Sequence, residues 1–160
     1  MVSVVQVREA NNTDADALFG MASSLATSTR VDRTVFDRVL TTMLTDDRQL
    51  LLVALVEGDS ERVGYLHGLV HPAFHANGTV AWVEELWVDA EHRRAGVARS
   101  MMEQFEGWAV NDVGASYVAV ATRRAAGFYA AIGYAESAVY FKKDLPAVQE
   151  PRRYDEVPGE

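Results

Sequence analysis

The stretch from Glu84 to Arg99 combines two adjacent carboxylates, a run of β-forming residues and a basic turn that contains glycine. Where such a turn leads into a helix, the first backbone N–H groups of the helix lack intrahelical partners and lie at the positive end of the helix dipole. They can then hold a phosphate group, and small residues such as Gly96 and Ala98 let the anion approach the backbone closely. The stretch therefore predicts an anion-binding turn beside two candidate acid–base groups.

The segments around this stretch predict a mixed α/β domain. Apolar residues recur at helical spacing in some segments, whereas others are short, rich in valine and leucine, and bounded by turn residues such as the Asn77-Gly78 pair. Asp32 is placed to cap one helix. Three consecutive strands indicate an antiparallel meander. In chain order we expect a strand at 2–7, helices at 14–27 and after 32, strands at 49–57, 62–70 and 79–88, a helix from 97 to about 114, a strand at 116–121, a helix at 122–132 and a strand at 135–142.

The composition limits the possible classes of protein. A chain of 160 residues with 49% hydrophobic content suits one buried core, so we expect a single domain at 1–145 followed by a flexible tail at 146–160. There is no cysteine, which excludes a cysteinyl thioester and thiolate metal sites. The formal net charge of -8 argues against nucleic-acid binding, and no apolar run approaches the roughly 20 residues that cross a bilayer. We expect a cytoplasmic protein with no nucleic-acid or membrane partner.

Two motifs occur on either side of the strand expected at 116–121. Arg93 to Ala98 reads R-x-x-G-x-A, and Ala125 to Tyr134 reads A-x-x-F-Y-x-x-x-G-Y. Together they resemble the GCN5-related N-acetyltransferase (GNAT) family, and the expected order of elements also suits this family. The resemblance implies an α/β fold with a largely antiparallel central sheet, flanked by helices, in which one parallel pair of strands splays apart at the cofactor slot.

The resemblance also implies that acetyl-CoA is the co-substrate, with no metal. In the family, backbone amides of the basic turn hold the pyrophosphate, and the strand before it pairs with the pantetheine amides. The arginine side chains of the turn either add positive charge at this site or form a solvated basic surface. Thr122 stands where the family often has asparagine, and a hydroxyl has fewer hydrogen-bonding options than an amide. The cofactor-binding residues implied in this way are Leu86, Trp87, Val88, Arg93, Arg94, Ala95, Gly96, Val97, Ala98, Arg99, Thr122, Ala125 and Phe128.

Three residues are candidates for acid–base catalysis. Tyr129 matches the family tyrosine that protonates the sulfur of coenzyme A, although the same position also suits a core aromatic residue. Glu84 and Glu85 face opposite ways in a regular strand, and either is a candidate to contact the amine or order a water, or is only a packing carboxylate. The segment from Glu84 to Val88 is similar to the L-E-D-x-x-V strand of diamine and polyamine acetyltransferases. In those enzymes the first acid of the strand contacts the amine or orders a water, and Glu84 shares its face with Leu86, so we favour Glu84 over Glu85.

His67, His71 and His75 are spaced four apart, which would align metal ligands on a helix. Gly68 and Pro72 argue against a helix there, so we expect no metal site. Plain strand or loop histidines are the main interpretation, with His71 or His75 at the mouth of an acceptor pocket as the alternative. Aromatic residues nearby either line an acceptor pocket or belong to the core; they are Tyr65, Phe74, Trp82 and Trp87.

These residues together predict an enzyme that moves acetyl from acetyl-CoA to a primary amine by direct attack in a ternary complex. The acidity of the chain and the glutamate pair favour a small cationic acceptor such as a polyamine, an aminoglycoside or an amino-acid derivative. A protein N-terminus or lysine is the alternative acceptor. A coenzyme A-binding regulatory module without catalysis is the alternative function. We also expect a homodimer.

Overall fold

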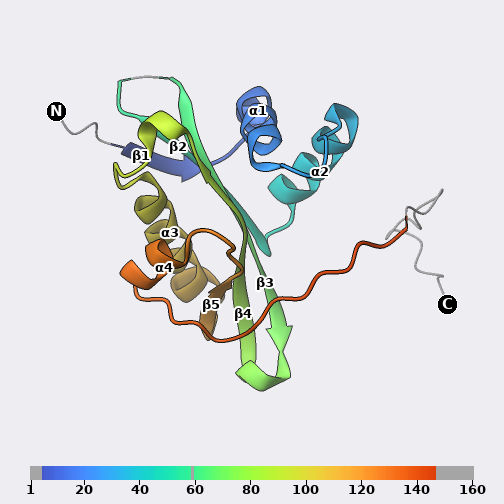
Figure 1. The fold of residues 1–160 in the computed structure, drawn as a ribbon, viewed down its shortest axis with the longest axis vertical. Helices are drawn as coiled ribbons and strands as arrows, with labels where there is room; N and C mark the ends of the chain where they lie inside the picture. The colour runs from blue at the N-terminus through green and yellow to red at the C-terminus, as the bar shows by residue number, and fades with distance from the viewer. Residues whose placement is uncertain (1–4, 59, 147–160) are drawn as a thin grey trace.

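A five-stranded sheet forms the centre of the structure, a computed structural model that describes residues 5–58 and 60–146 (Figure 1). The strands are β1 (Val5–Glu9), β2 (Gln49–Val56), β3 (Arg62–Ala73), β4 (Gly78–Val88) and β5 (Tyr117–Val120), and they lie side by side in this order. Each of the first four runs antiparallel to its neighbour, whereas β5 runs parallel to β4. This arrangement confirms the α/β fold class with a largely antiparallel sheet and one parallel pair.

Helices cover both faces of the sheet (Figure 1). Helices α1 (Ala15–Leu25) and α2 (Arg33–Thr45) lie on one face, and α3 (Val97–Trp108) and the short α4 (Ala126–Ala131) lie on the other. Because side chains alternate along a strand, β2 serves both cores: Leu50 and Leu52 pack toward α3, while Leu51 and Val53 pack toward α1 and α2. The continuous apolar run of β2 is explained by this burial on both faces.

Local signals in the sequence account for the starts and ends of several elements. The Asp32 carboxylate accepts a hydrogen bond of 2.9 Å from the backbone N–H of Val35 and so caps α2 as predicted. Asn77 adopts a left-handed conformation with a φ of 52° in the turn between β3 and β4. The helix that begins as α3 continues as a π-helical turn, Ala109–Val113, and ends at Gly114 with a φ of 71°.

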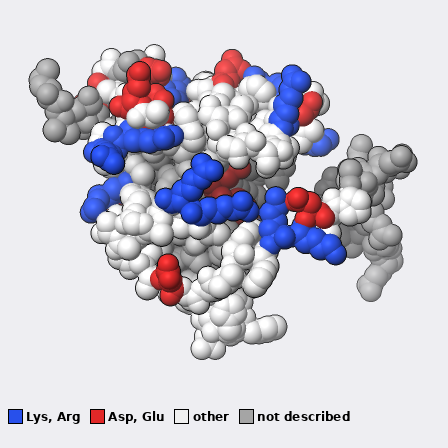
Figure 2. All heavy atoms as spheres, viewed as in Figure 1, with Lys and Arg blue, Asp and Glu red and all other residues white. Residues whose placement is uncertain are grey.

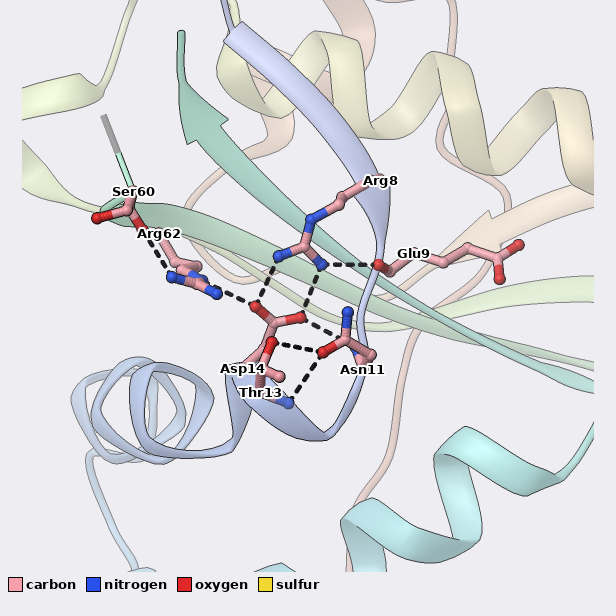
Figure 3. Close-up of polar contacts among 7 residues, drawn as sticks. All are labelled: Arg8, Glu9, Asn11, Thr13, Asp14, Ser60 and Arg62. Atoms are coloured by element: carbon pink, nitrogen blue, oxygen red, sulfur yellow. Dashed lines mark hydrogen bonds and ion pairs between the residues drawn. The ribbon is translucent and has the colours of Figure 1, made fainter. Parts of the chain in front are cut away.

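A fully buried carboxylate fastens the start of α1 to the sheet (Figure 3). Asp14 accepts two hydrogen bonds of 2.8 Å from Arg8 of β1 and one of 2.8 Å from Arg62 of β3. The backbone N–H of Asn11 donates a further bond of 2.9 Å. Burial alone would raise the pKa of Asp14, but these donors outweigh it and lower the pKa to about 2. The acid is therefore charged and structural at neutral pH.

Close packing between α3 and the sheet depends on a glycine of β3. A Cβ atom at Gly68 would lie 2.2 Å from the ring of Phe105, which is itself fully buried. The glycine therefore makes room for the largest buried side chain of α3, and α3 can lie directly against β3 at the level of Glu85 of β4.

The strand predicted at 135–142 is wrong: residues 134–146 form no strand. A strand needs a neighbouring edge for its backbone hydrogen bonds, and the described sheet ends at the short β5. The segment instead leaves α4 and crosses in front of the sheet as the orange-red stretch in Figure 1, with exposed Val139, Phe141 and Leu145. The tail predicted at 146–160 lies, apart from Pro146, outside the described residues, as does the start of the strand predicted at 2–7.

Candidate active site

A bulge in β4 sets the geometry of the site. Along β3 and β4, His67 is opposite Glu85, but the next residue, Gly68, is opposite Val83. Glu84 is therefore an extra residue with no partner on β3. A bulge of this kind breaks the regular alternation of side chains and bends the strand.

The bulge reverses which residues of β4 face which core. Before it, Ala81 and Val83 pack into the core under α3; after it, Leu86 and Val88 do so. Trp87 packs into the other core, under α1 and α2. Glu85 also lies on the side of α1 and α2, where Tyr65 of β3 donates a hydrogen bond of 2.9 Å to its carboxylate. Glu84 is exposed, so the two neighbouring acids occupy different environments.

The same bulge marks the place where the parallel strands separate. Pairing between β4 and β5 runs from Val80 opposite Tyr117 to Val83 opposite Val120 and ends there. Beyond the bulge, no strand of the described chain lies beside the edge of β4 from Glu84 to Val88 on this side. This open edge offers backbone N–H and C=O groups to an extended ligand, as an added strand would use them.

A turn with two left-handed residues leads from this open edge into α3. Arg94 has a φ of 62° and Gly96 a φ of 81°. No side chain caps α3, and its first backbone hydrogen bond runs from the N–H of Ser100 to the carbonyl of Gly96. The N–H groups of Val97, Ala98 and Arg99 precede that bond and point out of the helix start. Successive free N–H groups at a helix N-terminus form an anion site.

The turn is tied to the end of β4 and is open to solvent. Arg93 donates through Nε to the carbonyl of Val88 over 3.1 Å, which joins the turn to the open strand edge. A Cβ atom at Gly96 would have nothing within 4 Å, so the described chain leaves open space beside the turn. Figure 2 shows Lys and Arg side chains gathered across the middle of one face, with acidic atoms deeper among them. The face has local positive charge although the chain is acidic overall.

Tyr129 of α4 is buried. Its ring contacts those of Phe128 and Tyr134, with centroids 5.0 and 5.7 Å away. Among the residues that the structure describes, none forms a hydrogen bond with its hydroxyl. Burial raises the pKa of Tyr129, so that the phenol stays protonated and can act as a proton donor.

The neighbouring Tyr134 differs in this respect. Its hydroxyl donates a hydrogen bond of 2.8 Å to Glu106 of α3, and burial together with this contact raises its pKa strongly. Tyr134 therefore joins the end of the motif to α3. Of the two tyrosines, Tyr129 has the hydroxyl that a ligand can use.

Thr122 already has a structural role. Its hydroxyl accepts a hydrogen bond of 3.0 Å from the backbone N–H of Ala125, so 122–125 is a turn and α4 begins at Ala126, four residues later than predicted. The hydroxyl hydrogen is still available as a donor. The neighbouring Arg123 and Arg124 are exposed beside the end of β5, and sequence reasoning missed them as candidates for contacts to an anionic ligand.

A cavity of about 470 Å³ lies between the sheet and the helices α1 and α2. Tyr65 and Glu85 form its polar floor, and aliphatic and aromatic side chains of both helices form its walls. Burial raises the pKa of Glu85, with a smaller upward contribution from Glu84, against the lowering effect of the bond from Tyr65. A volume in the range of roughly 300–1,000 Å³ and a mostly apolar lining are typical of a small-molecule site.

A second buried polar group lies opposite Glu85 on β3. His67 bonds through Nε2 to the Gln49 side-chain oxygen over 2.8 Å, and the Gln49 amide nitrogen bonds to Asp46. This arrangement puts the proton on Nε2 and leaves Nδ1 as a buried acceptor without a partner among the described residues. Burial lowers the pKa of His67 and keeps it neutral.

The remaining histidines and aromatic residues take separate places. His75 bonds to the Tyr117 hydroxyl over 2.8 Å, and His71 is exposed. Within residues 5–58 and 60–146, no group of three or more His, Cys, Asp and Glu side chains is arranged to hold a metal ion. Phe74 is fully exposed. Of the four aromatic residues predicted either to line an acceptor pocket or to belong to the core, Tyr65 lines the cavity, whereas Phe74, Trp82 and Trp87 are not among its described lining residues.

The structure thus brings the predicted residues into three adjacent parts: the open edge of β4, the anion cradle and the start of α4. Sequence reasoning missed the cavity walls, which come from residues far from the motifs. Amphipathic spacing in α1 and α2 was the only signal for them, and it predicts a buried face without showing that the face is only partly covered.

These parts place an uncapped helix start, an open strand edge and a buried phenol in one region of the fold. The sequence profile of the Acetyltransferase (GNAT) family matches residues 8–134, and the chain belongs to this family. It is therefore a GNAT-type acyltransferase, from a family that uses acetyl-CoA. No curated protein matches its sequence. No helix within the described part of the chain has the length and apolar character to span a membrane.

Solved structures with the same fold differ widely in role. Glucosamine-6-phosphate N-acetyltransferase from Arabidopsis thaliana has 16% identity and a TM-score of 0.78, with 89% of this chain and 99% of that chain covered. A transcriptional regulator from Bacillus halodurans C-125 has 19% identity and a TM-score of 0.78, with 89% and 100% covered. AAC(6')-Iy in complex with the bisubstrate analogue CoA-S-monomethyl-acetylneamine has 18% identity and a TM-score of 0.74, with 89% and 100% covered. At these identities the likeness shows the fold.

Proposed function

We propose that the protein transfers acetyl from acetyl-CoA to the primary amine of a small cationic acceptor, by direct attack in a ternary complex. The observation that carries this proposal is the bulge at Glu84. It opens the edge of β4 on one side and turns Glu85 into the cavity on the other, so that a cofactor slot and an acceptor pocket adjoin the same few residues.

The cofactor fits the features of the slot. Backbone N–H groups from Arg94 to Arg99 would hold the pyrophosphate, since the helix start is uncapped and the space at Gly96 is open. The free edge of β4 at Leu86 and Val88 would pair with the pantetheine amides, with one N–H there left to stabilise an oxyanion. Acetyl-CoA supplies an activated acyl group on a thiol leaving group. Trp87, Thr122, Ala125 and Phe128 border the slot in this arrangement.

Tyr129 is the acid in the proposed mechanism. Its protonated phenol has no other partner in the described chain and would donate a proton to the departing thiolate. Its backbone is held in place by the first turn of α4, in which its N–H bonds to the carbonyl of Ala125 over 3.1 Å.

Glu85 is the better candidate for the base. Its carboxylate has a raised pKa, lines the cavity and is oriented by Tyr65, whereas Glu84 is exposed at the bulge. A carboxylate whose pKa is raised is a stronger proton acceptor, directly or through a water. We therefore propose that Glu85 accepts the proton of the attacking amine and that Glu84 has a secondary, electrostatic role. This assignment reverses the preference for Glu84 that was drawn from the sequence.

We also propose that the protein is a cytoplasmic homodimer. Val139, Phe141 and Leu145 are exposed on a segment that lacks any strand partner in the described chain, and a second copy would cover them. Phe141→Glu should then convert a dimer into a monomer in light scattering. A wild-type protein that is already monomeric would contradict the dimer.

An assay of free thiol release with acetyl-CoA and a panel of primary amines tests the function. Turnover that depends on Tyr129 and Glu85 is expected. A regulatory module that only binds coenzyme A is the competing function, because one structural neighbour is a transcriptional regulator. Tight acetyl-CoA binding without turnover on any amine, peptide or protein would favour this competing function.

A further inference from the structure

The walls of the cavity are almost wholly apolar. Leu18, Ala22 and Leu25 of α1 face Phe36, Leu40 and Met43 of α2 across it. Polar lining groups occur only at its two ends. Tyr65 and Glu85 lie at the buried floor, while Thr29, Arg30 and Asp32 belong to the exposed connection between the helices, at the mouth.

The floor carries one carboxylate, that of Glu85, which has no cationic partner within the described chain. No Lys, Arg or His of the described chain forms an ion pair with Glu85, and its hydrogen bond comes from the neutral Tyr65. A half-buried carboxylate of this kind is stabilised by a cation that arrives with a ligand. The charge pattern therefore provides for one ammonium group, at the floor.

The walls and the mouth provide no site for a second ammonium group. Among the described residues that line the cavity, Asp32 is the only other acid, and its carboxylate caps α2 through the N–H of Val35. Arg30 places a positive charge at the mouth. A second cation on the acceptor would have to lose its hydration against aliphatic side chains, which is costly.

From these observations we infer that the acceptor is a primary amine with a single ammonium group on a compact apolar body, such as an arylalkylamine or a branched alkylamine. Polyamines and aminoglycosides are poor acceptors. The inference rests on the proposed function and narrows its acceptor class. The apolar body fills the space between α1 and α2, and the ammonium lies at Glu85 next to the open edge of β4.

The test measures kcat/KM in the thiol-release assay with 2-phenylethylamine and isoamylamine against spermidine and kanamycin. We expect the two apolar amines to exceed the two polycations by about 10-fold or more, since removing one mismatched buried charge or polar group is worth at least that factor. A preference for spermidine or kanamycin would overturn the inference and leave the acetyltransferase function standing. Activity confined to peptides would also overturn it.

A substitution in the wall of the cavity tests the inference independently of the comparison between amines. Val39 of α2 lines the cavity and is 41% exposed, so Val39→Asp should fold normally and place a charge on the wall. We expect kcat/KM for 2-phenylethylamine to fall about 10-fold while the KM for acetyl-CoA stays unchanged. Val110→Asp, at a residue 64% exposed and outside the cavity lining, is the control. Equal effects of the two substitutions would contradict the inference. No turnover on any amine would instead refute the proposed function itself.

Discussion

The Tyr65 hydroxyl of β3 donates a hydrogen bond of 2.9 Å to the Glu85 carboxylate of the neighbouring strand β4. In the register of the sheet, Tyr65 is opposite Trp87 and Glu85 is opposite His67, so the bond joins diagonal neighbours on one face. It exists because the extra residue at Glu84 shifts Glu85 onto that face. One inserted residue thus decides which of two adjacent acids reaches the cavity between the sheet and helices α1 and α2.

Glu85→Gln should lower kcat with the amine acceptor by about 100-fold, because the amide keeps the shape of the side chain and cannot accept a proton. Acetyl-CoA binding should be unchanged. In the wild type, burial raises the pKa of Glu85, so activity should rise with pH through a pKa above the usual value for glutamate. Steady-state kinetics from acidic to neutral pH measure both effects.

Glu84→Gln is the matched control, since it removes an adjacent charge from an exposed residue. We expect a small effect on kcat. The acidic limb of the pH–activity profile should shift slightly to lower pH, because Glu84 contributes to the raised pKa of Glu85. If Glu84→Gln abolishes activity and Glu85→Gln does not, the assignment of the base is reversed.

Tyr129→Phe should reduce kcat by about 100-fold with little change in the KM for acetyl-CoA, because only the proton donor is lost. The hydroxyl has no partner in the described chain, so thermal stability should be preserved. Tyr134→Phe should show the opposite pattern: it removes the 2.8 Å bond to Glu106 and should lower stability by about 1 kcal/mol while turnover persists. Turnover, CoA binding by calorimetry and thermal melts separate the two outcomes.

Gly96 offers a test of the anion cradle with nearly isosteric variants. Its φ is 81°, so any side chain there strains the backbone, but Asn and Asp tolerate this conformation best and should carry the same strain, and a Cβ atom would meet nothing within 4 Å. Gly96→Asp should raise the KM for acetyl-CoA about 10-fold more than Gly96→Asn does, because it adds a negative charge beside the pyrophosphate. The difference should shrink at high salt. Equal effects of Asn and Asp would mean that the turn does not hold the phosphates.

The Asp14 cluster predicts how stability depends on pH. The folded pKa of about 2 lies below the ordinary aspartate value of 3.8, so Asp14 stabilises the fold fully above the unfolded pKa and loses this contribution as pH falls from about 4 through 2. Asp14→Asn should cost about 3 kcal/mol at neutral pH, because Arg8 and Arg62 lose their shared partner. Urea unfolding at several pH values measures both effects. A mutant as stable as the wild type at neutral pH would show that the cluster is dispensable.

The sequence predicted those features that depend on neighbouring residues. The cap at Asp32 and the turn at Gly96 need only local geometry, and each was found where the sequence placed it. The environment of Glu85 could not be predicted in this way, because it depends on the register between β3 and β4 and on where one residue is inserted. The strand predicted at 135–142 failed for a related reason, because a strand also requires a neighbouring strand as its partner.

Gly68→Ala should destabilise the protein by about 1–3 kcal/mol, because the added methyl group would overlap the Phe105 ring, at 2.2 Å, where the core cannot yield. Gly107 in α3 is the control: its Cβ would meet nothing within 4 Å, so Gly107→Ala should stabilise by about 0.5–1 kcal/mol through helix propensity. Urea denaturation gives both values. Since Gly68 lies beside the bulge, displacement of β3 should also disturb the Tyr65–Glu85 contact, and kcat should fall with stability in Gly68→Ala alone. A stable and fully active Gly68→Ala protein would show that α3 can move away from β3 without affecting the site.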